Sequence, residues 1–277
     1  MSKRKIALNE YSQEHLLYLE SIKRKKLLIS ILRYALFIIF IALWEVLARF
    51  NIIDPFIFSS PSRVIQTTIN LYNGGELFMH IGVTLAETVL GFLLGTLAGT
   101  SIAIILWWSE TIQRVLDPYL VVLNALPKIA LGPIIIVWIG AGMNSIIVMA
   151  LLISLIVTIM TVLSGFMEEN AQKQMLMKTL GASKWQIFSL VVLPASVPTI
   201  VSALKISVGM SWVGVIVGEY LVSKAGLGYL IVYGGQVFKL DLVMTSIAII
   251  SVLAALMYFG VSWLEKALIN WRSHSKG

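Results

Sequence analysis

The stretch Lys178–Pro198 reads KTLGASKWQIFSLVVLPASVP and is a polar, amphipathic interruption in a chain that is otherwise largely apolar. Gly181 is of the residue type that commonly ends a helix. Ser183 is of a type that commonly caps the next helix by accepting a hydrogen bond from a backbone N–H group. The pattern therefore predicts a helix, a sharp turn and a second helix.

The second predicted helix has one apolar face, formed by Trp185, Phe188 and Val192 at helical spacing. Pro194 and Pro198 are expected to end this helix and to start the next apolar segment, because proline lacks the N–H group that a helix interior needs. We expect the helix–turn–helix to lie along a membrane surface and to present a compact projection to a soluble partner.

The composition indicates an integral membrane protein. The 277-residue chain is 58% hydrophobic and only 13% charged, whereas soluble domains are roughly 45–50% apolar and about 25% charged. The net charge of +7 resides mainly at the N-terminus and in a few loops, which favours loops that face anionic lipid over a nucleic-acid surface. The sequence contains no cysteine, which excludes disulfides and thiol chemistry.

Six apolar segments are long enough to span a bilayer, for which about 20 residues are needed. We expect them near residues 34–50, 81–108, 119–139, 145–166, 197–221 and 243–264. The sequence thus predicts an all-α integral membrane protein with six transmembrane helices. Its expected parts are a basic extension (1–33), a membrane domain (34–265) with a polar segment at 167–195 between the fourth and fifth spans, and a tail (266–277).

Lysine and arginine predict the orientation of these spans. Most of them fall in loops on one side, which is the pattern of cytoplasmic loops, so we expect both termini and residues 167–195 in the cytoplasm. The N-terminal extension lacks the features of a cleaved signal peptide, and the first span is expected to be a retained anchor. The extension is either a solvated tail or a short interfacial helix with Leu16, Leu19 and Ile22 on one face.

The third predicted span contains the sequence ALPKIALGP, in which Pro127 and Pro133 flank Lys128 and Gly132. Proline removes a backbone donor and distorts a helix. Irregular backbone at membrane depth is tolerated only against protein or a water-filled cavity. Two interpretations remain open: the helix begins after Pro127, with the preceding part along the inner interface, or the span has an ordinary proline kink.

Glycines recur at every fourth position in two spans, as Gly91, Gly95 and Gly99 in one and as Gly214 and Gly218 in another. Such stripes allow two helix backbones to approach closely, so we expect helix packing there. The pattern does not say which helices touch. We detect no internal repeat, so a two-fold pathway would need two copies of the chain.

Five ionisable residues fall inside or near the predicted spans, and ionisable groups in a membrane are costly and often functional. They are Glu45, Glu87, Lys128, Lys205 and Glu219. One hypothesis is that some of them line a translocation pathway. The alternative is that they pair with one another or extend to the interface.

No constellation of residues supports catalysis, and no metal-ligand spacing or phosphate-binding loop occurs. We therefore expect no cofactor or metal on this chain. His15, His80 and His274 are far apart in the sequence and are expected to be solvated residues of loops or tails.

The opening stretch is similar to the inner-loop signature of binding-protein-dependent ABC importer permeases. Gly181, Leu193 and Pro194 match that signature, and Val191 conservatively replaces its isoleucine. The Glu-Ala-Ala triplet of the signature falls on residues 175–177, which read Met-Leu-Met and do not match. Contact at this segment is therefore expected to depend on its shape and on apolar side chains rather than on an acidic anchor.

Three further stretches resemble the nitrate, sulfonate and taurine branch of these permeases. They are SPS at 60–62, TLAETVLGFLLG at 84–95 and VGEYLVSKAGLGYLI at 217–231. The resemblance covers roughly residues 45–265. It implies a type I ABC importer permease in the bacterial cytoplasmic (inner) membrane. It also implies a small anion such as a sulfonate, taurine or nitrate as cargo, with a thiamine-precursor pyrimidine or another small heterocycle as the alternative.

The resemblance implies a divided machine. Two copies of the chain would form the pathway, two ABC ATPase subunits would hold ATP and Mg²⁺, and a substrate-binding protein would deliver cargo from outside. This chain would not be an enzyme. Its implied ATPase-coupling residues are Lys178, Thr179, Leu180, Gly181, Ala182, Ser183, Lys184, Trp185 and Pro194.

Two other classes of function compete with this interpretation. An ion-coupled secondary transporter would use the intramembrane charges, but the chain shows no inverted repeat of the kind many such transporters have. A membrane enzyme or scaffold is disfavoured by the missing catalytic cluster. Transport by this chain alone would support the former, and turnover without a soluble partner would support the latter.

Overall fold

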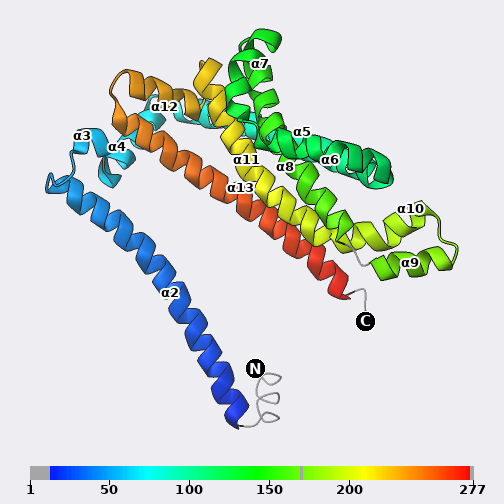
Figure 1. The fold of residues 1–277 in the computed structure, drawn as a ribbon. Coiled ribbons are helices and arrows are strands. Elements are labelled where there is room, and N and C mark those ends of the chain that lie inside the picture. The colour runs from blue at the N-terminus through cyan, green and yellow to red at the C-terminus, as the bar shows by residue number, and fades with distance from the viewer. Residues whose placement is uncertain (1–12, 169–170, 275–277) are drawn as a thin grey trace. The chain divides into compact units, whose positions relative to one another are not determined.

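The computed structural model describes residues 13–168 and 171–274, and every element assigned in these ranges is a helix (Figure 1). In chain order the elements are α2 (Gln13–Arg49), α3 (Pro55–Phe58), α4 (Pro61–Asn73), α5 (Leu77–Trp108), α6 (Glu110–Ala125), the 3-10 helix η1 (Lys128–Leu131), α7 (Gly132–Ile139), α8 (Met143–Met167), α9 (Ala171–Thr179), α10 (Lys184–Ile187), the π-helical turn η2 (Phe188–Val192), α11 (Leu193–Val222), α12 (Leu227–Gln236) and α13 (Leu240–His274). The predictions for residues 1–12, 169–170 and 275–277 lie outside the described residues.

Five helices are long and apolar enough to cross a membrane: Ser21–Arg49, Leu77–Trp108, Met143–Met167, Lys184–Val222 and Leu240–Lys266. A sixth candidate is the pair Glu110–Ala125 and Lys128–Ile139, bent by 85°. The predicted all-α, six-span architecture is therefore confirmed for the part of the chain that the structure describes. The sequence did not predict the short helices α3, α4 and α12.

The break in the third span distinguishes the two interpretations of its prolines. An 85° bend separates α6 from η1 and α7, which is far more than the kink of a continuous helix. The second half begins at Lys128, directly after Pro127. The helix thus restarts after that proline, as the first interpretation expects.

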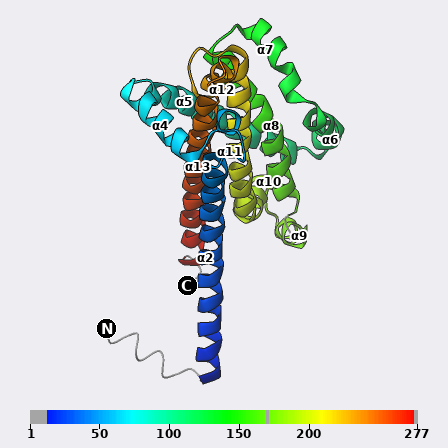
Figure 2. The ribbon, with the colours of Figure 1, turned by 90° about the vertical axis from the view of Figure 1, so that its left-hand side faces the viewer.

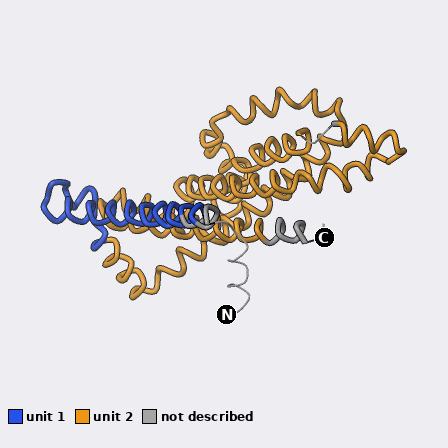
Figure 3. Tube along the Cα trace, turned by 90° about the horizontal axis from the view of Figure 1, so that it is seen from below, with its two compact units in different colours: residues 1–63 blue, residues 64–277 orange. Residues whose placement is uncertain are grey.

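The chain divides by its internal contacts into two units, residues 1–63 and 64–277 (Figure 3). The first holds α2, α3 and the start of α4, and the second holds the remaining helices. Helix α2 runs without a break across residues 33 and 34, the predicted boundary between the basic extension and the membrane domain. The boundary at residue 34 stays a prediction.

Helix α8 is the centre of the second unit, because both α5 and α11 pack on it. A Cβ atom built on Gly91 of α5 would lie 2.6 Å from Cβ of Ala150, and one built on Gly214 of α11 would lie 2.4 Å from Cα of the same alanine. Real Cβ atoms essentially never come that close, so only glycine fits at both positions. The other three predicted packing glycines, Gly95, Gly99 and Gly218, also face α8, against Ser154, Thr158 and Ile146.

Helix α11 stays in contact with α8 along its length. A Cβ atom on Gly165 would lie 2.7 Å from Thr199 near the start of α11. In the middle, the hydroxyl groups of Thr158 and Ser207 are 2.6 Å apart and buried. Small residues and hydroxyl pairs of this kind hold transmembrane helices together where the hydrophobic effect does not.

Two ends of the bundle in the second unit carry different elements. Helices α9 and α10 lie at one end and α12 lies at the other (Figures 1 and 2). The continuous helix Lys184–Val222 connects them, because it comprises α10, η2 and α11.

That continuity corrects one prediction, since Pro194 and Pro198 do not end the helix that begins at Lys184. The π-helical turn comes between α10 and α11, with the N–H of Leu193 bonded to the carbonyl of Phe188. Pro194 then falls in the first turn of α11, where the missing N–H of proline costs least. Pro198 lies within α11, and we attribute its tolerance to the packing of this helix on α8.

Candidate coupling site

The turn between α9 and α10 is a closed helix cap. Gly181 has a φ of 80°, a left-handed conformation that glycine adopts without strain. Its N–H donates to the carbonyl of Lys178 (3.0 Å), and the N–H of Ala182 donates to that of Met177 (3.0 Å). These two bonds form a Schellman motif. The predicted helix stop at Gly181 is confirmed.

The start of α10 is capped on the other side of the turn. The Ser183 hydroxyl accepts from the N–H of Gln186 (3.3 Å), and the Gln186 side chain accepts from the N–H of Ser183 (2.8 Å). This reciprocal pair is a capping box, which satisfies two backbone donors at once. Both sides of the turn are thus fixed by local hydrogen bonds.

An aromatic cluster anchors the segment to the membrane helices. The Phe188 side chain is only 3% exposed, and its ring centroid lies 4.9 Å from that of Trp107 and 5.5 Å from that of Phe166. These rings belong to α5 and α8. The buried side of α10 and η2 is therefore bound to the same helices that form the centre of the bundle.

Lys184 adds a polar anchor to α5. Its Nζ donates to the carbonyl of Trp108 (2.5 Å) and lies 5.6 Å from the ring centroid of Trp107. Trp108 is the last residue of α5, where helix carbonyls lack intrahelical donors and favour a cation. Although it is one of the predicted coupling residues, Lys184 here binds the chain's own helix end.

The outer side of the same segment is apolar and exposed. Leu180 at the turn is 73% exposed and Trp185 is 62% exposed. Met175 and Leu176, which take two positions of the mismatched triplet, are also largely exposed on α9. The prediction of one apolar face for Trp185, Phe188 and Val192 is thus only partly right: Phe188 and Val192 are buried, and Trp185 faces outward.

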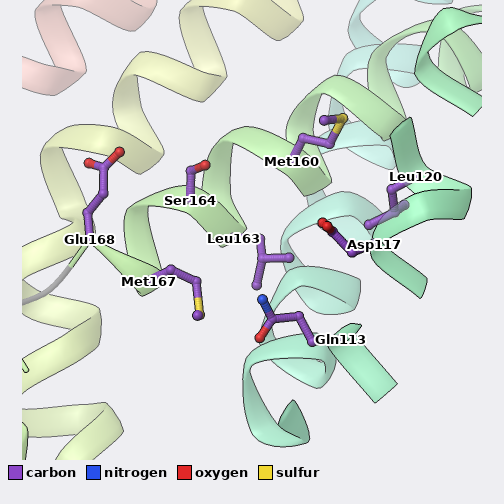
Figure 4. A pocket seen from close by; sticks show the side chains of 8 residues that line it. All are labelled: Gln113, Asp117, Leu120, Met160, Leu163, Ser164, Met167 and Glu168. Carbon is purple, nitrogen blue, oxygen red and sulfur yellow. The ribbon is translucent and has the colours of Figure 1, made fainter. Parts of the chain in front are cut away.

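Two adjoining cavities lie beside the coupling segment. One, of about 280 Å³, lies between α6 and α8, with Gln113 and Asp117 on one wall and Ser164 and Met167 on the other (Figure 4). The second, of about 320 Å³, shares Gln113 and Met167 and extends to α9 and α10; its other lining residues are Trp107, Glu110, Gln174, Lys178, Ala182, Lys184 and Ile187.

Two of the five predicted intramembrane charges serve local structure. Within the first unit, a Glu45 carboxylate oxygen accepts from the N–H of Ser62 at the start of α4 (3.0 Å), where the helix dipole favours an anion. In the second unit, the Lys128 ammonium donates to the carbonyl of Asn124 in the last turn of α6 (2.9 Å). Each charge therefore forms a hydrogen bond with a backbone group at a helix end.

Lys205 of α11 forms an ion pair with Glu265 of α13. Both side chains are mostly buried, at 21% and 23% exposed. The sequence analysis singled out Lys205 but missed Glu265, because that residue lies just beyond the predicted sixth span. The pair agrees with the alternative hypothesis that intramembrane charges meet one another.

We expect Lys205→Glu to destabilise the protein by about 1–3 kcal/mol, because it places two carboxylates together at a partly buried site. The double variant Lys205→Glu/Glu265→Lys should recover most of that loss by restoring a pair of opposite charges. Thermal unfolding of the purified chain in detergent measures both effects. A double variant as unstable as the single one would show that the pairing is not what stabilises this site.

The remaining two predicted charges, Glu87 and Glu219, come together near the α12 end of the bundle. Glu87 is 2% exposed and Glu219 is 1% exposed. The Thr84 hydroxyl donates to Glu219 Oε1 (2.6 Å) and accepts from the N–H of Leu227 (2.7 Å). The spacing Thr84-x-x-Glu87 puts both residues on one face of α5, but nothing in the sequence pointed to residues 226–228 as partners.

The prediction that His80 is solvated is wrong. This histidine lies in the first turn of α5, is buried, and its Nδ1 accepts from the N–H of Gly226 (2.9 Å). Its ring stacks on that of Tyr229. A lone histidine in a sequence gives no sign of such an interaction, because the partner lies 146 positions away.

The fold resembles a solved importer. The structure described as inward-facing conformations of the MetNI methionine ABC transporter matches with a TM-score of 0.62 and 20% identity, over 69% of this chain and 95% of that one. At this identity the match concerns the fold alone. It confirms the predicted type of membrane architecture.

Most of the chain also matches a known protein family in sequence. Residues 91–272 match the family described as binding-protein-dependent transport system inner membrane component. The chain belongs to this family. The match includes the coupling segment and four of the five long membrane helices in whole or in large part.

Two relatives of this permease are bacterial transport permease proteins. It is 30% identical to the formylaminopyrimidine transport permease protein ThiX of Halalkalibacterium halodurans, over 85% of this chain and 94% of the relative. It is also 30% identical to the putative aliphatic sulfonates transport permease protein SsuC of Bacillus subtilis, over 86% of this chain and 87% of the relative. The resemblance stated from the sequence is confirmed, and the chain is an ABC importer permease.

The family and the apolar helices together make this permease a multi-pass protein of the inner membrane. Its role is transport, and importers of this family work with ATPase subunits and a binding protein. Among residues 13–168 and 171–274, no group of three or more His, Cys, Asp or Glu side chains is arranged to hold a metal ion.

Proposed function

We propose that two copies of this permease form the pathway of an ATP-driven importer. Two separate ABC ATPase subunits hold ATP and Mg²⁺ and dock on the segment 167–195. An extracytoplasmic substrate-binding protein delivers the cargo. The permease itself supplies the pathway and the mechanical connection and hydrolyses nothing.

The exposed apolar turn carries this proposal. Leu180 and Trp185 project from a turn whose backbone is fixed by the cap at Gly181 and the capping box at Ser183. Large apolar side chains on a rigid projection are favourable contact groups, because little conformational entropy is lost when a partner covers them. The absence of the family's Glu at position 175 means that the contact depends on these side chains rather than on an acidic anchor.

The roles of the coupling residues follow from their positions. Leu180 and Trp185 belong to the contact surface, while Thr179, Gly181 and Ser183 give the turn its shape. Ala182 packs inward against the hydrophobic core. Lys178 lines the cavity beside the segment together with Lys184, which also holds the segment to α5. Pro194 starts α11 behind the π-helical turn.

The orientation proposed here places the coupling segment and both termini in the cytoplasm. It rests on the concentration of lysine and arginine in the loops of that side. The turn between α11 and α12 then faces the outside, where the binding protein docks. Glu45 binds the N–H of Ser62 and Lys205 pairs with Glu265, so we propose no pathway role for either.

We propose a small sulfonate-like anion, such as taurine or another alkyl sulfonate, as the cargo. The sequence resemblance to the sulfonate branch and the name of the Bacillus subtilis relative support it. The name of the Halalkalibacterium halodurans relative supports a formylated pyrimidine instead. Uptake of labelled taurine and of a labelled formylaminopyrimidine by cells that express the complete system distinguishes the two.

The coupling role is tested with the double variant Gly181→Glu/Trp185→Glu. The variant should lose co-purification of the ATPase subunits or lose ATP-dependent uptake in proteoliposomes, because Trp185→Glu places a charge on the apolar contact surface and the new side chain at position 181 strains the left-handed turn that presents it. The matched control is Gly235→Glu/Phe238→Glu, which changes an exposed glycine and an exposed aromatic residue at the α12 end. The control should retain ATPase association.

Two outcomes would contradict the proposal. One is normal ATPase association and normal uptake by the Gly181→Glu/Trp185→Glu variant. The other is uptake by the permease alone, driven by a proton gradient in vesicles without ATPase subunits, which would instead support an ion-coupled transporter.

A further inference from the structure

The α12 end of the bundle holds a sealed carboxyl pair that the proposed transport function does not use. Glu87 of α5 and Glu219 of α11 are both at least 98% buried. Glu87 lies one helical turn after Thr84 on the same face of α5, and the Thr84 hydroxyl donates to Glu219 Oε1 (2.6 Å), so the geometry places the two carboxyl groups side by side. Two carboxylates so close and so far from water repel strongly if both are ionised.

Glu219 is the acceptor of the pair. Its Oε1 accepts from the Thr84 hydroxyl (2.6 Å), and its Oε2 accepts from the N–H of Gly228. With donors directed at both oxygens, the carboxyl group of Glu219 is suited to the ionised form, which only accepts hydrogen bonds.

Glu87 has the opposite environment. Its Oε2 is buried, and no hydrogen-bond donor reaches that atom from the described residues. An ionised carboxylate left in this position would keep an unsatisfied buried charge next to another anion. A proton on Glu87 removes that charge and turns the group into a donor toward Glu219.

Among the described residues, the one lysine of the helices that hold the pair, Lys205 of α11, is paired with Glu265 and lies about four turns from Glu219. Helix α8 contains no ionisable residue, and α12 contributes only the phenols of Tyr229 and Tyr233. His80 of α5 accepts a hydrogen bond at Nδ1, so its ring is neutral with its proton on Nε2. The charged side chains at this end are Glu76, Lys224, Lys239 and Asp241; the first three are exposed and Asp241 is partly exposed.

The backbone encloses the Glu219 carboxyl group. A Cβ atom on Gly226 would lie 2.3 Å from Glu219 Oε1, and one on Gly228 would lie 2.7 Å from Oε2. The turn from Ser223 to Gly228 therefore passes directly over the carboxyl group with no space for another side chain. Such an enclosed pair is not positioned to exchange an ion with a pathway.

We propose that Glu87 and Glu219 form a proton-binding site in which Glu87 carries the single proton and donates it to ionised Glu219. The proton ties α5 to the end of α11 and, through Glu219, to the turn that leads into α12. The site holds these elements together at the end of the bundle opposite the coupling segment.

Exchange of each carboxyl for an amide tests this assignment, because glutamine resembles a protonated carboxylic acid. Glu87→Gln keeps one donor and one acceptor oxygen and should change the midpoint of thermal unfolding little. Glu219→Gln replaces one of two accepting oxygens by an NH₂ group that would face the Thr84 hydroxyl or the N–H of Gly228. It should lower the midpoint far more. Equal losses in the two variants, or a larger loss for Glu87→Gln, would overturn the assignment.

Infrared spectroscopy of the purified full-length protein provides a readout that does not depend on Glu219→Gln folding. The wild type should show the carbonyl band of a protonated carboxylic acid at neutral pH, and Glu87→Gln should lose it. Glu76→Gln, which changes an exposed carboxyl group at the same end, should retain the band. A Glu87→Gln spectrum with the band unchanged would contradict a proton on Glu87. Neither measurement involves ATPase subunits, so failure here leaves the proposed transport function untouched.

Discussion

The variant Gly214→Ala is expected to lower the stability of the protein by about 1–3 kcal/mol, which is the usual cost of forcing an extra methyl group into a close-packed site. The added Cβ atom would lie 2.4 Å from Cα and 2.9 Å from N of Ala150. Both are backbone atoms of α8, so no side chain can rotate away. Helices α8 and α11 would have to separate, and that movement would also disturb α5, because Gly91 packs on the same alanine.

The matched control for this variant is Gly209→Ala in the same helix. A Cβ atom at Gly209 meets nothing within 4 Å, so the substitution should be neutral or should stabilise the helix by about 0.5–1 kcal/mol. The midpoint of thermal unfolding in detergent measures both variants. If the two alanines had the same effect, the close approach of α11 to α8 at residue 214 would not be the reason for glycine there.

The variant Phe188→Ala should have an effect of similar or larger size, about 3 kcal/mol, because it empties the centre of an aromatic cluster. Phe188 contacts rings from α5 and α8, and its side chain is almost completely buried. Its loss should loosen α10 from the bundle and lower both the thermal stability and the yield of folded protein.

Trp185→Ala is the counterpart that separates stability from coupling. Trp185 is three residues earlier in the same segment but largely exposed. Its removal should leave the free energy of unfolding within about 1 kcal/mol of the wild-type value and should weaken ATPase association. The opposite result, a stable Phe188→Ala and an unstable Trp185→Ala, would mean that the segment packs on the bundle through its other face.

Local sequence signals were sufficient for the coupling turn. The left-handed residue at Gly181 and the cap at Ser183 depend on neighbours within four positions, and such short-range preferences can be read from a single sequence. The apolar runs also predicted most ends of the long helices to within a few residues. These features follow from hydropathy and capping chemistry alone.

Features that depend on tertiary packing were not accessible. The proline rule failed at Pro194 because a π-helical turn precedes it and the helix is held by α8. The glycine stripes indicated close packing but gave no partner, since the shared contact at Ala150 is a property of three helices together. His80 was wrongly predicted to be solvated for the same reason, because its partner is distant in the sequence.

The unbroken helix from Lys184 to Val222 has a mechanical consequence. Its 39 residues correspond to a rod of about 58 Å at 1.5 Å per residue. The rod packs on α8 from Thr199, near the start of α11, to Gly218, near the end of the rod. Because close-packed glycine contacts resist sliding, a force applied at the coupling turn moves α11 and α8 as one body. We therefore expect a displacement at the coupling turn to be carried by α11 and α8 together toward the far end of the bundle.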